Sequence, residues 1–262
     1  MSRPRALVAS AVLPLAALLA ACGTGTPATD GTGAAGAGPT GALSGTVTVL
    51  AAASLTDSFT TLAADFHAAN PGVTVEPSYG ASSTLVQQVN NGAPADVIAL
   101  AGQSAAAPLD PTLVVRTDVF ATNVLEIAVP PDNPGTVTGL ADLGRTGLKV
   151  VLCAASVPCG KAADTTLAKA GVTASVVSRE LDVKATLAKV RLGEADAAVV
   201  YRSDVVAAKG SVRGIPVPDA VNTTLRYPII ALDREAATSA FVAYVLSRAG
   251  EATVQSFGLG AP

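Results

Sequence analysis

Aromatic side chains, histidine and charged residues are scarce in this chain of 262 residues. It has no tryptophan, aromatic residues make up 3% of it, and its only histidine is His67. Enzymes built on a serine nucleophile elbow or a phosphate-binding loop need motifs that are missing, because neither Gly-x-Ser-x-Gly nor Gly-x-x-x-x-Gly-Lys occurs. No basic run is interleaved with aromatic residues, so nucleic acid is not an expected partner. We therefore expect a protein that is not an enzyme.

Candidate ligands for a metal cation are also too dispersed to predict a site. The carboxylates Asp57, Asp96 and Asp204 lie far apart in the sequence, whereas a cation site needs clustered carboxylates, histidines or cysteines. The net charge is −3, but anion binding depends on the local field rather than on the total charge. The composition thus leaves room for an anionic ligand and predicts no cofactor.

The first 22 residues have the layout of a bacterial export signal. Arg3 and Arg5 precede an apolar stretch that ends in Leu19-Ala20-Ala21-Cys22, and this order is typical of a signal peptide. The stretch is too short to favour a membrane-spanning helix. Its cysteine resembles that of a bacterial lipobox, in which cleavage leaves a lipidated N-terminal cysteine. We expect a signal peptide over residues 1–21 and an extracytoplasmic protein anchored to the cell membrane by lipid on Cys22.

A linker follows the anchor. Residues 23–44 consist mainly of Gly, Thr, Ala and Pro with a single charged residue, a composition that cannot bury enough apolar surface to fold. We therefore expect the lipidated cysteine and a flexible linker over residues 22–44.

The two remaining cysteines, Cys153 and Cys159, are close in sequence. In an exported chain such a pair predicts a disulfide. Two unpaired thiols are the alternative, and a redox-active pair is disfavoured because the spacing is not Cys-x-x-Cys.

From residue 45 onward, strand-like and helix-like segments alternate. Runs such as Thr46–Ala52 indicate buried strands, and apolar residues at helical spacing, such as Leu55, Phe59 and Leu62, indicate helices. The expected strands are 46–52, 73–77, 96–101, 124–129, 148–153, 195–201, 213–217 and 226–232, and the expected helices are 55–66, 83–89, 160–169, 183–192, 234–248 and 251–257. This alternation predicts an α/β fold with mainly parallel sheets flanked by helices.

The pattern restarts after residue 123, which favours two lobes. We expect residues 45–123 and 229–262 to form lobe 1 and residues 124–228 to form lobe 2, with the C-terminal helices returning to the first lobe. A cleft between two lobes is a usual place for a ligand.

The predicted helix starts carry small or polar residues. Ser54, Ser82 and Ser83 stand at the first two helices, Cys159 opens the third, and Asp182-Val183 opens the fourth. Each helix start presents unpaired N–H groups and about half a positive charge. Several of them converging on the cleft would bind an anion without Lys or Arg. Taken singly, a Ser or Asp at such a position is more simply an N-cap.

Further short motifs occur along nearly the whole folded chain. They are Ala51–Thr56 (AAASLT), Tyr79–Leu85 (YGASSTL), Gly92–Asp96 (GAPAD), Val157–Gly160 (VPCG), Asp182-Val183-Lys184, Val200–Asp204 (VYRSD) and Tyr227-Pro228. Together they resemble the molybdate-binding proteins of ABC importers, which are members of the type II solute-binding family. The resemblance implies a two-lobe type II binding-protein fold, a ligand cleft between the lobes, and delivery of molybdate or tungstate to a transporter permease.

The resemblance also implies which groups bind the anion. They are the hydroxyl and N–H groups of Ser54 and Ser82, the backbone N–H groups of Cys159 and Val183, and the phenolic hydroxyl of Tyr201, with Ser83 as an additional candidate. Cys159 departs from the family pattern, which has alanine there. A disulfide to Cys153 would stiffen this loop and lower the ordering cost of binding.

Hydrogen-bond donors alone suit an anion that carries no proton. Molybdate and tungstate are such dianions at neutral pH, whereas the proton of monohydrogen phosphate would face another donor and leave buried groups unpaired. Sulfate has the same charge, so a binding protein for another tetrahedral oxyanion such as sulfate is the main alternative. A surface lipoprotein without a transport role is a second alternative. In each case we expect a monomer.

Overall fold

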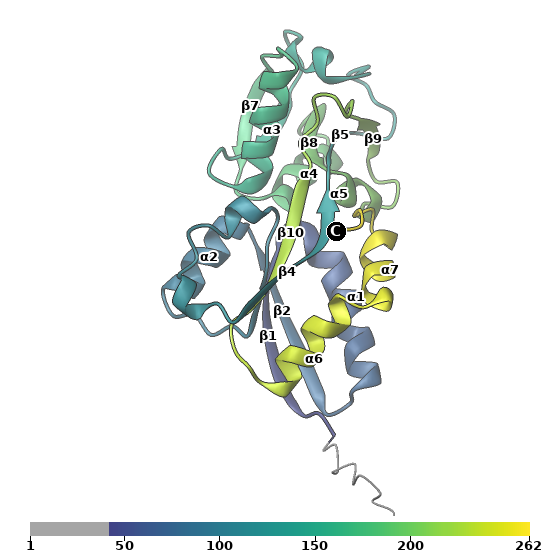
Figure 1. The fold of residues 1–262 in the computed structure, drawn as a ribbon. Helices are drawn as coiled ribbons and strands as arrows, with labels where there is room; N and C mark the ends of the chain where they lie inside the picture. The colour runs from purple at the N-terminus through teal and green to yellow at the C-terminus, as the bar shows by residue number, and fades with distance from the viewer. Residues whose placement is uncertain (1–41) are drawn as a thin grey trace, which may run out of the picture. The chain divides into compact units, whose positions relative to one another are not determined.

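Two five-stranded sheets, each covered by helices, form one compact unit in the computed structural model, which describes residues 42–262 (Figure 1). The first sheet has the strand order β2-β1-β3-β10-β4 and the second the order β7-β6-β8-β5-β9. The predicted α/β class with two sheets is confirmed. The expected signal peptide, Cys22 and most of the expected linker lie outside the described residues.

We call the first sheet with its helices the first lobe. It contains β1 (Gly45–Ala52), β2 (Val73–Gly80), β3 (Val97–Ala99), β4 (Arg116–Asn123), β10 (Leu225–Ala231), α1 (Thr56–Ala69), α2 (Ser82–Asn90), α6 (Ala236–Val245) and α7 (Arg248–Ser256), with the short 3₁₀ helices η1 (Ala53–Leu55), η2 (Gln103–Ala105) and η3 (Pro111–Leu113).

The second sheet and its helices make up the second lobe. Its elements are β5 (Leu125–Val129), β6 (Val150–Cys153), β7 (Val176–Glu180), β8 (Ala197–Tyr201), β9 (Arg213–Pro216), α3 (Pro158–Lys169), α4 (Val183–Arg191), α5 (Arg202–Ala207) and the 3₁₀ helix η4 (Leu140–Gly144).

Each sheet is mixed and not mainly parallel as expected, because β10 and β5 run against their neighbours, so parallel pairs lie on one side and antiparallel pairs on the other. In the first sheet β1 is parallel to β2 and β3, while β10 is antiparallel to β3 and β4. In the second, β6 is parallel to β7 and β8, while β5 is antiparallel to β8 and β9. β4 and β7 are not among the strands predicted from the sequence. Both are edge strands with several exposed or half-buried side chains, so their apolar signal is weak.

The chain passes between the lobes at two adjacent places. β4 ends at Asn123 and β5 begins at Leu125, so a single residue separates the two sheets. The return lies between β9 and β10, where the side chain of Asn222 accepts a hydrogen bond from Leu125 N and donates one to Leu125 O, at 3.0 and 2.9 Å. The two connections are therefore bound to each other. The lobe boundaries expected from the sequence, at 123/124 and 228/229, stay a prediction.

The core of the first lobe places aromatic side chains between the sheet and the helices α1, α6 and α7, which lie together on one side of the strands (Figure 1). Phe59 packs edge-on against Phe120 and Phe241, with ring centroids 5.6 and 6.4 Å apart. The C-terminal helices α6 and α7 thus pack with α1 in the first lobe. On the other face, Leu50 and Ile98 pack with α2 through Leu85, so the alternating strand residues are buried on both sides.

Within residues 42–262 no helix combines the length and the apolar character that crossing a bilayer requires.

The start of α3 depends on a close backbone contact at Gly160. A methyl group there would overlap the carbonyl of Ala154, at the turn that follows β6. We predict that Gly160→Ala lowers the free energy of unfolding by about 1–3 kcal/mol because the turn must shift to make room. Gly139→Ala is the control, since its added methyl group meets no atom within 4 Å. Urea denaturation in which both variants are equally stable would contradict this account of the turn.

Candidate functional site

A small cavity lies between the two lobes, where helices of both begin. It is lined by Ala52, Ala53, Ser54, Gly80, Ala81, Ser82, Ala101, Val157, Pro158, Cys159, Asp182, Val183 and Tyr201. These residues stand at the carboxyl ends of strands and at the starts of the following helices, where ligands bind in open α/β sheets. Its volume is about 20 Å³, and one water molecule needs about 10–15 Å³.

All five residues predicted to bind the anion line this cavity: Ser54, Ser82, Cys159, Val183 and Tyr201. The structure therefore brings together groups that are widely separated in the sequence. Ser83, the additional candidate, is not among the lining residues and lies instead on a neighbouring groove with Gln87.

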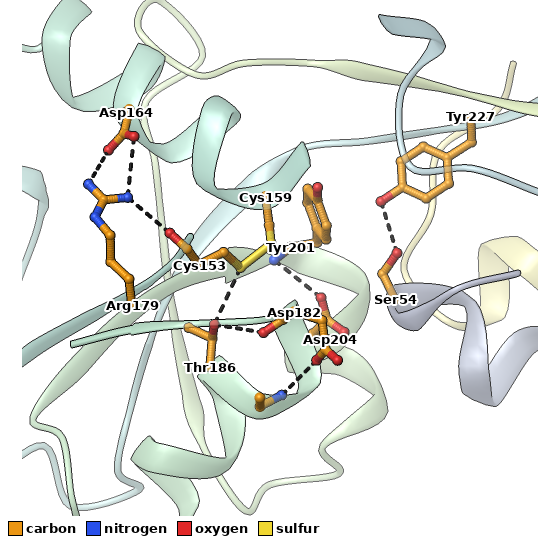
Figure 2. Close-up of a disulfide and its surroundings, with 11 residues drawn as sticks. Ser54, Cys153, Cys159, Asp164, Arg179, Asp182, Thr186, Tyr201, Asp204 and Tyr227 are labelled. Carbon is orange, nitrogen blue, oxygen red and sulfur yellow. Dashed lines mark hydrogen bonds and ion pairs between the residues drawn. A yellow bond between two sulfur atoms is a disulfide. The ribbon is translucent and has the colours of Figure 1, made fainter. Parts of the chain in front are cut away.

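Both serines make side-chain hydrogen bonds within the protein. Ser82 Oγ accepts from Ala101 N at 2.9 Å, and Ser54 Oγ lies 3.1 Å from the hydroxyl of Tyr227 (Figure 2). Neither serine is a side-chain N-cap, because the N-caps of α1 and α2 are Leu55 and Ala81 and no side-chain cap bond is present at either. The simpler N-cap interpretation is therefore wrong for both serines. A hydroxyl that accepts from a backbone N–H keeps its own hydrogen free to donate.

The starts of α3 and α4 contribute backbone donors. Cys159 follows Pro158 as the second residue of α3, and no side-chain cap bond is present at that start. Asp182 caps α4, as the simpler interpretation predicts, with Oδ1 accepting from Ala185 N at 2.9 Å. This cap does not use the N–H of Val183, the first residue of α4. The first N–H groups of a helix have no partner within it, so Cys159 and Val183 can donate into the cavity.

Tyr201, the last residue of β8, contributes a neutral donor. Its side chain is 1% exposed, and its hydroxyl has no hydrogen-bond partner among residues 42–262. Burial raises the pKa of this phenol well above its ordinary value, so the hydroxyl keeps its proton. A buried hydroxyl without a partner costs free energy unless a ligand or water accepts from it.

An ion pair joins the two lobes beside the cavity. Lys184 Nζ, on α4, lies 2.7 Å from Asp57 Oδ2, on α1, and 3.6 Å from Asp204 Oδ1, on α5. The Asp57 carboxylate thus reaches from the first lobe to the second. Asp57 and Asp204 are scattered in the sequence, and neither the sequence spacing nor the charge pattern signals that Lys184 links them.

Asp204 is the one fully buried carboxylate near the site. Its side chain is 0% exposed and Oδ2 accepts from Tyr201 N at 3.3 Å (Figure 2). Burial raises the pKa of Asp204 to about 7, against the lowering effect of Lys184. This carboxyl group is bound to the backbone N–H of the cavity residue Tyr201. A group next to the cavity therefore titrates near neutral pH.

The predicted disulfide between Cys153 and Cys159 is confirmed, with an S–S distance of 2.06 Å and Cα atoms 5.8 Å apart. It joins the end of β6 to the first turn of α3, and Thr186 of α4 donates to Cys153 Sγ at 3.3 Å (Figure 2). Arg179 of β7 donates to the carbonyl of Cys153 at 2.9 Å. Three elements of the second lobe, β6, α4 and β7, thus hold Cys153 in place, and the disulfide passes this constraint to Cys159 and its N–H group.

The raised pKa of Asp204 predicts how stability depends on pH. The folded protein binds this proton more strongly than the unfolded chain, whose carboxyl pKa is about 3.9, so Asp204 lowers the free energy of unfolding as pH rises from about 4 to about 7. Asp204→Asn removes this loss. We expect the stability of the variant relative to the unmodified protein to increase across that range.

Urea denaturation at several pH values between 4.5 and 7.5 measures this difference. Asp164→Asn is the surface control, because its carboxylate pairs with Arg179 in a partly exposed ion pair. A stability difference for Asp204→Asn that does not change with pH would be inconsistent with a carboxyl group titrating near 7.

The fold and the cavity at the helix starts define a solute-binding protein. The family of bacterial extracellular solute-binding proteins matches residues 47–260, and the chain belongs to this family. Within it, the chain is 39% identical over 254 residues to the molybdate-binding protein ModA of Mycobacterium tuberculosis, covering 95% of both chains. The resemblance to molybdate-binding proteins of ABC importers is confirmed.

Solved structures share the two-lobe fold but carry different anions in their names. The periplasmic molybdate-binding protein of Azotobacter vinelandii matches with a TM-score of 0.73 at 19% identity, over 82% of this chain and 99% of its own. The sulfate-binding protein SubI of M. tuberculosis matches with a TM-score of 0.72 at 19% identity, over 82% of this chain and 86% of its own. The fold alone therefore does not choose the anion.

Proposed function

We propose that this protein binds molybdate, and tungstate in the same way, and delivers it to the permease of an ABC transporter. The observation that carries the proposal is that Ser54, Ser82, Cys159, Val183 and Tyr201 all line one cavity. None of its lining residues is Lys or Arg, and the one carboxylate among them, Asp182, caps α4. Neutral donors of this kind hold a dianion that accepts hydrogen bonds and donates none.

The cavity supports a small inorganic anion over an organic one. At about 20 Å³ it holds little more than one water molecule, so a tetrahedral oxyanion requires the lobes to move slightly apart to make room for it. Lobe closure around the ligand lets a permease distinguish loaded from empty protein. The ion pair between Lys184 and Asp57 supports such closure, because it joins the lobes next to the site.

The parts of the proposal that concern export, membrane anchoring and oligomeric state rest on the sequence. A signal peptide over residues 1–21 and a lipidated Cys22 would anchor the protein outside the cytoplasm, with residues 22–44 as a tether. We propose a monomer that binds and releases its ligand without a chemical reaction. A sulfate-binding role is the second candidate, supported by the similar fold match to a sulfate-binding protein.

Removing single donors tests the site. We predict that Ser82→Ala and Tyr201→Phe each weaken molybdate binding about tenfold or more, because a hydrogen bond to a charged ligand contributes about 1.5–3 kcal/mol. Tyr201→Phe should not lower the unfolding free energy of the ligand-free protein, since the hydroxyl it removes is buried without a partner among residues 42–262.

Calorimetric titration with molybdate measures these affinities, and Ser83→Ala is the matched control because Ser83 does not line the cavity. If Ser82→Ala and Tyr201→Phe bind as tightly as Ser83→Ala, the assignment of the cavity as the anion site is wrong.

Thermal stabilisation by different anions separates the candidate functions. We expect molybdate and tungstate to raise the melting temperature more than sulfate or phosphate at equal concentration, because stabilisation follows the ratio of ligand concentration to Kd. A larger shift with sulfate would favour the second candidate. No shift with any anion would favour a surface lipoprotein without a transport role.

A further inference from the structure

A chain of three hydrogen-bonded side chains leads from the junction of the lobes into the cavity. It starts at Asn123, the last residue of β4, and continues through Tyr227 of β10 to Ser54. Asn123 and Tyr227 are 2% and 0% exposed. Neither of them lines the cavity, so neither touches a ligand there directly, and Ser54 is the lining residue that Tyr227 reaches by a hydrogen bond.

The direction of this chain is set at Asn123. Its side-chain oxygen accepts from Val124 N at 3.0 Å, which fixes which end of the amide is which. The amide nitrogen then faces Ser203 Oγ at 2.8 Å and the Tyr227 hydroxyl at 3.2 Å. An amide nitrogen only donates, so the Tyr227 oxygen accepts from Asn123.

The same direction passes to Ser54. Because Tyr227 accepts from Asn123, its own hydrogen is free, and Ser54 Oγ at 3.1 Å is an acceptor within hydrogen-bond distance of it. A buried hydroxyl hydrogen left without an acceptor would cost about 1–3 kcal/mol. Ser54 therefore accepts from Tyr227, and its own hydrogen points to the remaining neighbour, the cavity.

We propose that Asn123 is a specificity-determining positioning residue, which acts through Tyr227 to hold the Ser54 hydroxyl as a donor and so makes the cavity reject oxyanions that carry a proton. The inference rests on the proposed function. Ser82 is polarised in the same sense by Ala101 N, but a backbone N–H is removed only by proline, which also constrains the backbone, whereas the side chain of Asn123 can be replaced without that constraint.

The chemistry of the rejected anion follows from this arrangement. An oxygen of molybdate accepts from Ser54. The hydroxyl of monohydrogen phosphate would instead point its hydrogen at the hydrogen of the Ser54 hydroxyl. Two donors facing each other leave both unsatisfied in a buried site. A rotatable Ser54 could turn its lone pair to such a ligand, and the bond from Tyr227 prevents that rotation.

Asn123→Asp reverses the chain and is the primary test. At pH 8 the introduced carboxylate can only accept, so Tyr227 donates to it and Ser54 donates to Tyr227, which turns a lone pair to the cavity. We expect the ratio of molybdate affinity to monohydrogen phosphate affinity to fall at least tenfold. At pH 5.5 the protonated carboxyl regains a hydrogen, and molybdate affinity relative to the unmodified protein should recover.

The comparison with the unmodified protein at each pH removes the contribution of other titrating groups. Those facing the chain are Tyr201 of β8, Tyr227 of β10 and Asp204 of α5, with Lys184 of α4 and Asp57 of α1 beyond Asp204. Affinities are measured by calorimetry with molybdate and by displacement of molybdate with phosphate.

Two further variants keep the test decisive. Tyr227→Phe removes the middle of the chain without introducing a charge, so Ser54 can rotate and the affinity ratio should fall less than in Asn123→Asp. Ser203→Ala removes the other acceptor of the same amide and should leave the ratio unchanged. If Asn123→Asp does not fold, the inference is tested by comparing the affinity ratio of Tyr227→Phe with that of Ser203→Ala.

The outcomes separate the two levels of the account. Failure of the unmodified protein to bind molybdate would contradict the proposed function and this inference with it. Molybdate binding by the unmodified protein, with an unchanged affinity ratio in the folded Asn123→Asp and Tyr227→Phe variants, would overturn this inference alone. Equal weakening of both anions would show a merely structural role and would overturn it as well.

Discussion

The structure depends on hydrogen-bond donors that lie together at one cavity and are not satisfied within the protein. Helix starts from both lobes meet at the cavity, and the first N–H groups of a helix have no partner within it. The hydroxyl of Tyr201 is likewise buried without a partner among residues 42–262. Leaving such groups unpaired costs free energy, and an anion that accepts from all of them recovers it.

Apart from Asp182, which caps α4, the charged groups lie around the cavity and not in its lining. Lys184 reaches across to Asp57 and faces the buried Asp204, so this cation, which follows Val183 in α4, is already paired. A paired cation can hold the lobes together without binding the ligand as a counter-ion. The raised pKa of Asp204 makes the same region sensitive to pH, although every donor assigned to the anion keeps its proton.

Local features of the fold and site could be predicted from the sequence, and contacts between distant residues could not. Ser54, Ser82, Cys159 and Val183 stand at helix starts that the sequence makes visible as small or polar residues before an apolar period. Their assignment as anion ligands, like that of Tyr201, came from the family resemblance. Tyr227 belonged to a recognised motif, but its bond to Ser54 spans 173 positions and that of Lys184 to Asp57 spans 127. The edge strands β4 and β7 were missed because exposed positions interrupt their apolar pattern.

The most direct test of the central claim is a crystal structure of the protein grown with molybdate, with the metal located by its anomalous scattering. The account predicts one strong peak in the cavity, with its oxygens within hydrogen-bond distance of Ser54, Ser82, Cys159, Val183 and Tyr201. A peak elsewhere with the cavity empty would contradict it, for example in a second groove, which is lined by Lys161 and Arg226 and is distinct from the groove beside Ser83.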